Sequence, residues 1–262
     1  MKHMLITGST RGIGFGLAQR FIEADCQVTI NGMTVESVNS ALQKLRKAYP
    51  SAKVQGFVGD VGNYQEVERL WDNATKSFGK IDIWINNAGI DQERKNAWDI
   101  EPTAFERIVK TNLLGIFNGS TVAFKRMLEQ GNGQIFNMEG FGSDGMIREK
   151  MTFYGTTKSA LRYFTRSLAK EASKTPVMVG TLSPGMVVTD FLLKSINLNS
   201  KDAEKNKKIF NILADEVDTV TDFLSQRILE SNKNDDHIAW LTKGKVIWRF
   251  VSSPFSKRNL FN

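Results

Sequence analysis

Short apolar segments rich in β-branched residues alternate with longer segments of helical spacing over the first 190 residues. We expect buried strands at residues 3–7, 28–31, 54–58, 81–86, 134–138 and 177–182. We expect helices at residues 13–24, 35–48, 64–78, 103–128 and 156–173. Because a helix between two strands makes those strands parallel neighbours, the alternation predicts an α/β fold with helices on both faces of a parallel sheet.

The chain shows no internal repeat and no Pro-rich or Ser-rich linker, so we predict one domain over residues 1–262. Residues 190–236 are polar at both ends and helical in spacing at 209–229, which suggests a substrate lid inserted above the sheet. Residues 237–262 are expected to form a C-terminal tail in which aromatic and basic residues are interleaved. The pattern fits an arm packed on a partner subunit or on the protein's own core, and it also fits contact with a membrane surface or an apolar ligand.

Composition and charge exclude several classes of protein. The 35 Lys and Arg residues exceed the 28 Asp and Glu residues by seven, but they form no continuous basic tract, so we expect no nucleic-acid partner. A single cysteine, Cys26, cannot form an internal disulfide and favours a reducing compartment. No apolar run reaches the roughly 18 residues of a membrane span, and the first strand begins too near Met1 for a signal peptide. We therefore expect a cytoplasmic protein, with peripheral membrane contact left open, and no metal site.

A glycine-rich turn joins the first expected strand to the first expected helix. Gly8 permits the turn, Gly12 lets the backbone approach a pyrophosphate, and Gly14 lets helix and strand pack closely. The free N–H groups at a helix N-terminus add a partial positive charge for the same anion. We therefore predict a Rossmann-type, doubly wound fold that binds a dinucleotide through residues Gly8, Ser9, Thr10, Arg11, Gly12, Ile13 and Gly14.

The residues after the second expected strand indicate which nicotinamide cofactor binds. A carboxylate at this point would bind the adenosine ribose hydroxyls and repel a 2′-phosphate, but the chain has Asn31 and Met33 in this segment. Arg11 in the glycine turn can pair with the phosphate, although it can equally be a solvated surface charge. We therefore predict NADP(H), with Asn31 and Met33 beside its adenosine end.

The order of further motifs identifies the chain as resembling the short-chain dehydrogenase/reductase family. The matching residues are Thr7–Gly8 with Gly12 and Gly14, Asp60–Val61, Asn86–Asn87–Ala88–Gly89, Asn112, Tyr154 with Lys158, and Pro184–Gly185 with Val187 and Thr189. The resemblance implies that Asp60 and Val61 contact the adenine, that Asn87 and Gly89 border the adenosine ribose, and that Val187 and Thr189 hold the nicotinamide end. Ala88, Pro184 and Gly185 are further predicted cofactor-binding residues. It also implies a homo-oligomer, a dimer or a tetramer, packed through the helices at 103–128 and 156–173.

Tyr154 and Lys158 are four residues apart, so their side chains project from one face of a helix. A free phenol keeps its proton to about pH 10, so a nearby cation such as Lys158 must tune it for proton transfer to or from a carbonyl oxygen. By family resemblance, Lys158 also binds the nicotinamide ribose, and Asn112 holds a water in the proton relay. We therefore predict Tyr154, Lys158 and Asn112 as catalytic residues.

The sequence departs from the family where a serine usually orients the carbonyl. Glu139 and Gly140 occupy the expected serine positions, and Ser143 is the nearest hydroxyl. Ser143 is therefore either the fourth catalytic residue, presented by a glycine-rich loop, or an ordinary loop serine. Without a second hydrogen-bond donor, Tyr154 alone must polarise the carbonyl oxygen.

Within the family, several segments resemble chlorophyll b reductases. These are residues 135–143, 154–158, 183–190, 206–212 and 238–242. The resemblance implies reduction of the formyl group of chlorophyll b to hydroxymethyl by NADPH. Apolar walls for such a broad, flat substrate are expected from Phe141, Met146, Met186 and Phe191. Two alternatives are a reductase of another carbonyl, such as a 3-oxoacyl thioester, a sugar or a steroid-like compound, and an NADP-binding scaffold without turnover.

Overall fold

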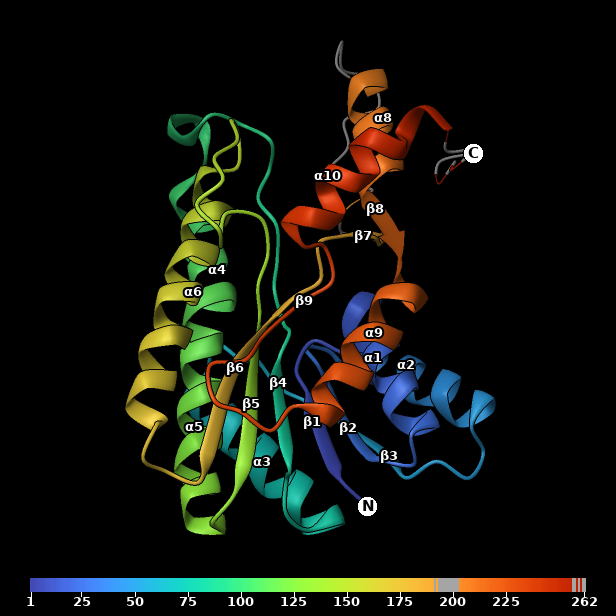
Figure 1. Cartoon of the computed structure of the whole chain (residues 1–262). Coiled ribbons are helices and arrows are strands. Elements are labelled where there is room, and N and C mark those ends of the chain that lie inside the picture. The colour runs from blue at the N-terminus through green and yellow to red at the C-terminus, as the bar shows by residue number, and fades with distance from the viewer. Residues whose placement is uncertain (191, 193–202, 256–257, 259, 261–262) are drawn as a thin grey trace.

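Seven strands form a single parallel sheet in the order β3-β2-β1-β4-β5-β6-β9 (Figure 1). In this computed structural model the described residues are 1–190, 192, 203–255, 258 and 260. The strands are β1 His3–Ile6, β2 Gln27–Gly32, β3 Val54–Val58, β4 Ile83–Asn86, β5 Gly133–Met138, β6 Val177–Ser183 and β9 His237–Ala239. The strand order reverses between β1 and β4, which creates a crevice for a ligand at the carboxyl ends of the strands.

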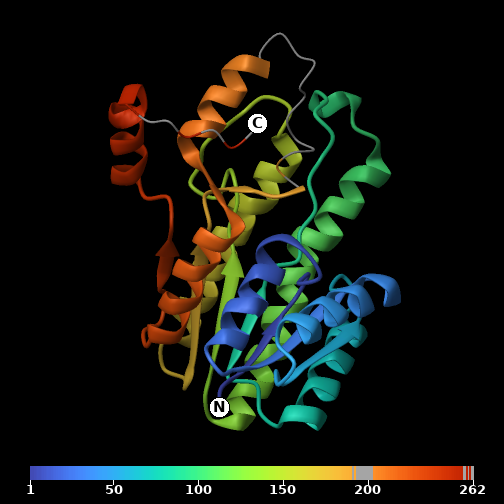
Figure 2. The same ribbon diagram turned by 90° about the vertical axis from the view of Figure 1, so that its right-hand side faces the viewer.

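Helices cover both faces of the sheet, as the alternating pattern predicts (Figures 1 and 2). One face carries α1 Gly12–Glu23, α2 Val35–Ala48 and α9 Val217–Glu230. The other carries α3 Tyr64–Phe78, α4 Pro102–Val109, α5 Gly115–Gln130 and α6 Thr152–Ala172, and a π-helical turn, Lys110–Leu114, joins α4 to α5. The predicted α/β, doubly wound, single-domain fold is confirmed.

Two apolar cores hold these layers together. Phe21 of α1, Leu224 of α9 and Ile30 of β2 lie fully buried in the first core. Trp71 of α3 and Trp84 of β4 stack in the second core with their ring centres 5.9 Å apart. Burial of such side chains stabilises the fold by roughly 1.5–3 kcal/mol for each large residue.

The C-terminal third differs from the prediction. The expected helix at 209–229 is divided into α8 Ala203–Leu213, strand β8 Ala214–Glu216 and α9, and β8 pairs in parallel with β7 Met186–Val188. Because α9 packs against α1 and belongs to the first core, the prediction of a lid over 190–236 is wrong for this helix.

The chain from residue 237 onward also begins inside the sheet rather than as a tail. Strand β9 pairs with β6, with Ile238 opposite Leu182. Helix α10 Lys243–Ser252 and a 3₁₀ turn, Ser253–Phe255, follow it. None of the described helices is long and apolar enough to cross a membrane.

Candidate active site

The glycine turn has the geometry that a dinucleotide needs. Gly8 and Gly12 have φ angles of +59° and +58°, and a Cβ on Gly8 would lie 2.6 Å from the Cα of Ala88. The Asn87 side-chain amide donates to the carbonyl oxygens of Thr7 (2.9 Å) and Gly8 (3.0 Å), which fixes the turn to the end of β4. Helix α1 begins directly at Gly12, and Arg11 at its N-cap provides no side-chain capping bond. The first amides of α1 therefore suit the pyrophosphate of a dinucleotide.

Residues at the predicted adenosine end divide into inward and outward groups. The Asn31 side chain is buried, accepts from Gly8 N (3.3 Å) and donates to Gly59 O (3.1 Å), so it supports the turn from inside. The Asp60 carboxylate pairs with Lys110 Nζ at 2.7 Å, while Val61 is buried in the second core. Arg11 and Met33 are exposed at this edge. Arg11 is therefore the exposed cation that fits the 2′-phosphate prediction, whereas the Asn31 side chain is occupied elsewhere.

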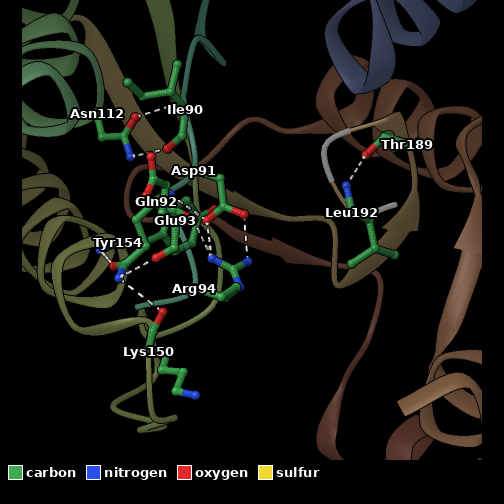
Figure 3. Close-up of polar contacts among 10 residues, drawn as sticks. All are labelled: Ile90, Asp91, Gln92, Glu93, Arg94, Asn112, Lys150, Tyr154, Thr189 and Leu192. Carbon is green, nitrogen blue, oxygen red and sulfur yellow. Dashed lines mark hydrogen bonds and ion pairs between the residues drawn. The ribbon is translucent and has the colours of Figure 1, made fainter. Parts of the chain in front are cut away.

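The predicted nicotinamide residues follow β6 in the chain. A Cβ on Gly12 would lie 3.6 Å from Thr189 Cγ2, so Thr189 stands beside the turn. The Thr189 hydroxyl accepts a hydrogen bond from Leu192 N at 3.3 Å (Figure 3). Pro184 and Val187 are buried, and Gly185 has a φ of +72°. These four residues therefore lie in the segment after β6, of which Thr189 lies next to the start of α1.

The structure describes three of the four predicted substrate residues, and they belong to two different segments of the chain. Met186 of β7 packs half-buried against the cluster around Phe210 and Ala214. Phe141 is half-buried, Met146 is 60% exposed, and both belong to the loop that follows β5. Phe191 lies outside the described residues. Their contribution to substrate binding stays a prediction.

Tyr154 and Lys158 lie on α6, which begins at Thr152, four residues earlier than predicted. Both side chains are buried, and Lys158 Nζ lies 5.8 Å from the centre of the Tyr154 ring. Lys158 Nζ also donates to the carbonyl oxygen of Met138 at 3.0 Å, which holds the ammonium at the carboxyl end of β5. The helix therefore brings the two predicted residues together as expected.

Burial governs the protonation of this pair. It raises the pKa of the Tyr154 phenol, with the Asp91 carboxylate adding to the rise and the Arg94 guanidinium opposing it. It lowers the pKa of Lys158 to about 8, with the Glu139 carboxylate opposing the fall. The phenol therefore stays neutral at physiological pH and can donate a proton. Arg94 is a cation acting on the phenol that the sequence did not predict, and the tuning of Tyr154 by Lys158 stays a prediction.

The usual serine position has no room for a side chain. A Cβ on Gly140 would overlap the Tyr154 hydroxyl oxygen and lie 3.1 Å from Lys158 Cε. Ser143 folds back onto this glycine: its buried hydroxyl accepts from Gly140 N at 3.1 Å, and its own N–H donates to Gly140 O at 3.1 Å. Ser143 is thus held beside the Gly140 backbone that the phenol touches, so the structure brings it to the site. Its catalytic role stays a prediction.

Sequence reasoning missed the segment of residues 90–94, which connects Asn112 to Tyr154 (Figure 3) and which we call the strap. Asn112, fully buried in the π-helical turn, accepts from Ile90 N at 2.8 Å and donates to Ile90 O at 2.9 Å. Two residues on, the Gln92 side chain accepts from Tyr154 N at 2.7 Å and donates to Lys150 O at 3.0 Å. Gln92 therefore caps the helix that carries Tyr154, where Met151 at the N-cap offers no side-chain bond.

An ion pair occupies the outer end of the same strap. Arg94 binds both carboxylate oxygens of Asp91, at 2.9 and 2.6 Å, and donates to Gln92 O at 2.9 Å. This pair supplies the two opposing charges that act on the Tyr154 phenol. The available signal was a Gln and two opposite charges soon after the Asn-Asn-Ala-Gly segment, but only the fold determines that they contact α6.

A second missed group is Glu139, which stands at the first of the two expected serine positions. Its carboxylate is 2% exposed, and it contacts Arg162 Nη1 of α6 at 3.5 Å and His237 Nε2 of β9 at 3.1 Å. A buried carboxylate at a strand end was the visible signal. The Glu139 carboxylate therefore connects the edge strand β9 to α6, the helix that carries Lys158.

Comparison with known proteins decides the family. The family model described as short chain dehydrogenase matches residues 2–199. The chain belongs to the short-chain dehydrogenase/reductase family. It is therefore an oxidoreductase, and NADP(H) is consistent with this family.

Two relatives and one solved structure give the range of this similarity. The chain is 34% identical, over its whole length, to the probable chlorophyll(ide) b reductase NYC1 of Arabidopsis thaliana, but it spans only 55% of that protein. Over 95% of its length it is 37% identical to the chlorophyll(ide) b reductase NOL of Oryza sativa subsp. japonica, of which it spans 74%. A gluconate 5-dehydrogenase from Burkholderia cenocepacia J2315 in complex with NADP and tartrate is 26% identical, with a TM-score of 0.77 over 92% of this chain and 94% of that one.

Proposed function

We propose that this short-chain reductase uses NADPH to reduce the formyl group of chlorophyll b, or of a close chlorin relative, to hydroxymethyl. The observation that carries the proposal is the 37% identity to a chlorophyll(ide) b reductase over 95% of the chain, which spans the Tyr154–Lys158 site. The site supports it chemically, because a neutral, buried phenol stands next to an amine at the carboxyl edge of the sheet.

The chain's own residues supply the proton side of the reaction. Bound NADPH supplies the hydride for the formyl carbon when it lies along the crevice. Tyr154 Oη donates its proton to the formyl oxygen, so the C=O bond becomes CH–OH and the phenol is left as a phenolate. Lys158 stabilises this phenolate by its positive charge, and a proton taken up from solvent restores the phenol. We expect Ser143, whose hydroxyl accepts from Gly140 N, to give the same oxygen a second hydrogen bond.

An aldehyde suits a site with this departure from the family pattern. A formyl carbon carries only one substituent besides its oxygen, so it needs less electrophilic help than a ketone. Gly140 also keeps the space at the phenol free of a side chain. A preference for NADPH over NADH rests on Arg11 and on the absence of an acidic residue in the Asn31–Met33 segment.

Incubation of the purified chain with NADPH and chlorophyll b, followed by pigment chromatography, tests the proposal. We expect a hydroxymethyl pigment to form with stoichiometric NADPH oxidation. In parallel reactions a 3-oxoacyl thioester and a steroid ketone should react more slowly at equal concentration. Unchanged chlorophyll b alongside reduction of either other carbonyl would overturn the named substrate. No turnover of any carbonyl by protein that binds NADPH would favour the scaffold interpretation.

We also propose a homo-oligomer formed through α5 and α6. Phe117 of α5 is 48% exposed, Leu114 beside it is 41% exposed, and Tyr163 of α6 is 80% exposed, so these helices present apolar groups outward. Light scattering on the protein as it elutes from a sizing column checks the oligomer. The Phe117→Glu variant should have a lower molecular mass than the wild type.

We also propose a reducing compartment such as the cytoplasm, which fits the buried Cys26 that forms no disulfide.

A further inference from the structure

Helix α10 has its apolar side facing solvent. Ile247, Trp248 and Val251 are 65%, 68% and 65% exposed, Phe250 is 46% exposed, and no residue of the helix is buried. On an ordinary surface helix these side chains would face the core and the charged ones would face water. We call these four residues the α10 apolar face.

Two charged residues of the same helix, Lys245 and Arg249, face the protein. Arg249 is 12% exposed, binds the Asp215 carboxylate at 2.7 Å and donates to Leu213 O at 2.9 Å. Lys245 Nζ lies over the Trp240 ring, 2.8 Å from its centre, and the indole N–H of Trp240 donates to Asp215 at 2.7 Å. Arg258 binds the other Asp215 oxygen at 2.7 Å. Because these bonds hold the charged side inward, the helix cannot turn its apolar face to the core without breaking them.

The α10 apolar face lies at the end of the molecule where the active site opens. Helix α10 stands beside α8 beyond the carboxyl ends of the strands, on the same end as the start of α6 (Figures 1 and 2). The segments that follow β4 and β5 at this end expose Trp98 (84%) and Ile147 (96%). Exposed apolar groups are therefore present on more than one segment at this end of the molecule.

The size and charge of the face decide which partner fits it. Its four side chains belong to one short helix, and an apolar patch of this extent is smaller than the about 800 Å² that each partner contributes to a standard protein interface. A helix of this kind is large enough to insert among lipid headgroups, where Trp side chains and neighbouring cations are favoured. Lys243 at the start of α10 and Lys208 on α8 are exposed beside it, and the whole chain carries seven excess positive charges.

We propose that the α10 apolar face docks on the surface of an anionic phospholipid bilayer and turns the entrance of the active site toward the lipid. The docking goes beyond the proposed function and does not depend on which carbonyl the site reduces. It would give a lipid-dissolved substrate direct access to the crevice, while the core of the fold stays outside the bilayer.

Vesicle cosedimentation of the full chain tests the docking. We expect binding to vesicles of phosphatidylglycerol and phosphatidylcholine, weaker binding to phosphatidylcholine alone, and weaker binding at high salt. Val251→Glu should weaken binding to the mixed vesicles by about tenfold, since it places a carboxylate in the inserted face. Val35→Glu is the matched control: Val35 is 55% exposed at the start of α2, and its replacement should leave binding within about twofold.

Folding and oligomeric state are measured on the same samples. Circular dichroism should show both variants folded, because neither valine is buried. Absence of vesicle binding by the wild type, or equal binding by Val251→Glu and wild type, would overturn the proposal. A fall in molecular mass caused by Val251→Glu, without vesicle binding by the wild type, would assign the face to a second copy of the chain instead.

Discussion

Restoring the family's serine at position 140 should inactivate this enzyme rather than improve it. A Cβ there would lie 3.1 Å from Lys158 Cε and 3.3 Å from Tyr154 Cζ, and it would overlap the Tyr154 hydroxyl oxygen. Carbon atoms in contact prefer separations of about 3.5–4.0 Å, so the phenol must move by roughly 1 Å. A displacement of that size at a reacting group costs on the order of 100-fold in rate. We therefore expect Gly140→Ser to lower kcat for carbonyl reduction about 100-fold.

The assay separates this effect from general damage. Steady-state reduction of chlorophyll b gives kcat, and quenching of protein fluorescence by NADPH gives the cofactor affinity, which should stay within about threefold because the clash is at the phenol. Gly155→Ala is the matched control: it adds the same carbon one residue after Tyr154, where a Cβ meets no atom within 4 Å. It should keep wild-type kcat. A folded Gly140→Ser protein with wild-type or higher kcat would refute the reasoning and show that the phenol accommodates a serine.

Three further changes test other parts of the site and its surroundings. Lys158→Met should raise the free energy of unfolding at pH 7, measured by urea denaturation, by on the order of 3 kcal/mol. The reason is that burial lowers the pKa of Lys158 from 10.5 to about 8, so the charged lysine destabilises the folded state below pH 8. The gain should fade as pH rises from 8 to 10.5, and a less stable variant at pH 7 would contradict it. Glu139→Gln removes the carboxylate that opposes the lowering of the Lys158 pKa and leaves Arg162 and His237 without their acidic partner. The alkaline limb of the pH–rate profile should therefore move to lower pH, and His237→Asn should move it less. An unmoved limb would show that Glu139 does not act on the charge of Lys158. Asp215→Asn should destabilise the anchorage of α10 by about 3 kcal/mol, because the largely covered Arg249 then loses its counterion, and limited proteolysis should cut within 243–252. Glu216→Gln, at the exposed neighbour of Asp215, should leave that cleavage rate unchanged, and equal resistance of both variants would argue against the anchor.

Much of the fold could be predicted because its signals are local. Six short apolar runs separated by helical segments match six of the seven strands of the sheet, and the glycine turn has the strand–turn–helix context that its spacing predicts. Tyr154 and Lys158 were predictable because four-residue spacing on a helix fixes a shared face.

The missed elements depend on partners far along the chain. Residues 214–216 carry no strand pattern, and β8 forms because its backbone pairs with Met186–Val188 and because Asp215 is surrounded by donors from beyond residue 239. Strand β9 is only three residues long and is defined by its pairing with β6. Periodicity could not reveal either one, since tertiary pairing overrides local preference in short segments.

The same limit applies inside the active site. Gln92 caps a helix 62 residues away, and Glu139 meets a histidine 98 residues away, so neither contact has a local signature. Asn31 illustrates the opposite error: its place after the second strand is right for a cofactor residue, but its side chain points inward to Gly8 and Gly59. The position of a residue along a strand predicts that it lies at the carboxyl edge of the sheet. The direction of its side chain depends on packing, which the sequence pattern does not reveal.

The most direct test of the account is the rate of carbonyl reduction by Tyr154→Phe at saturating NADPH. Removal of the hydroxyl alone should leave the ring packed and the cofactor affinity within about twofold, while kcat falls by on the order of 100-fold to 10,000-fold, because the formyl oxygen loses its proton donor. A phenylalanine variant that binds NADPH and reduces the carbonyl at the wild-type rate would contradict the central claim that the Tyr154 phenol carries the proton.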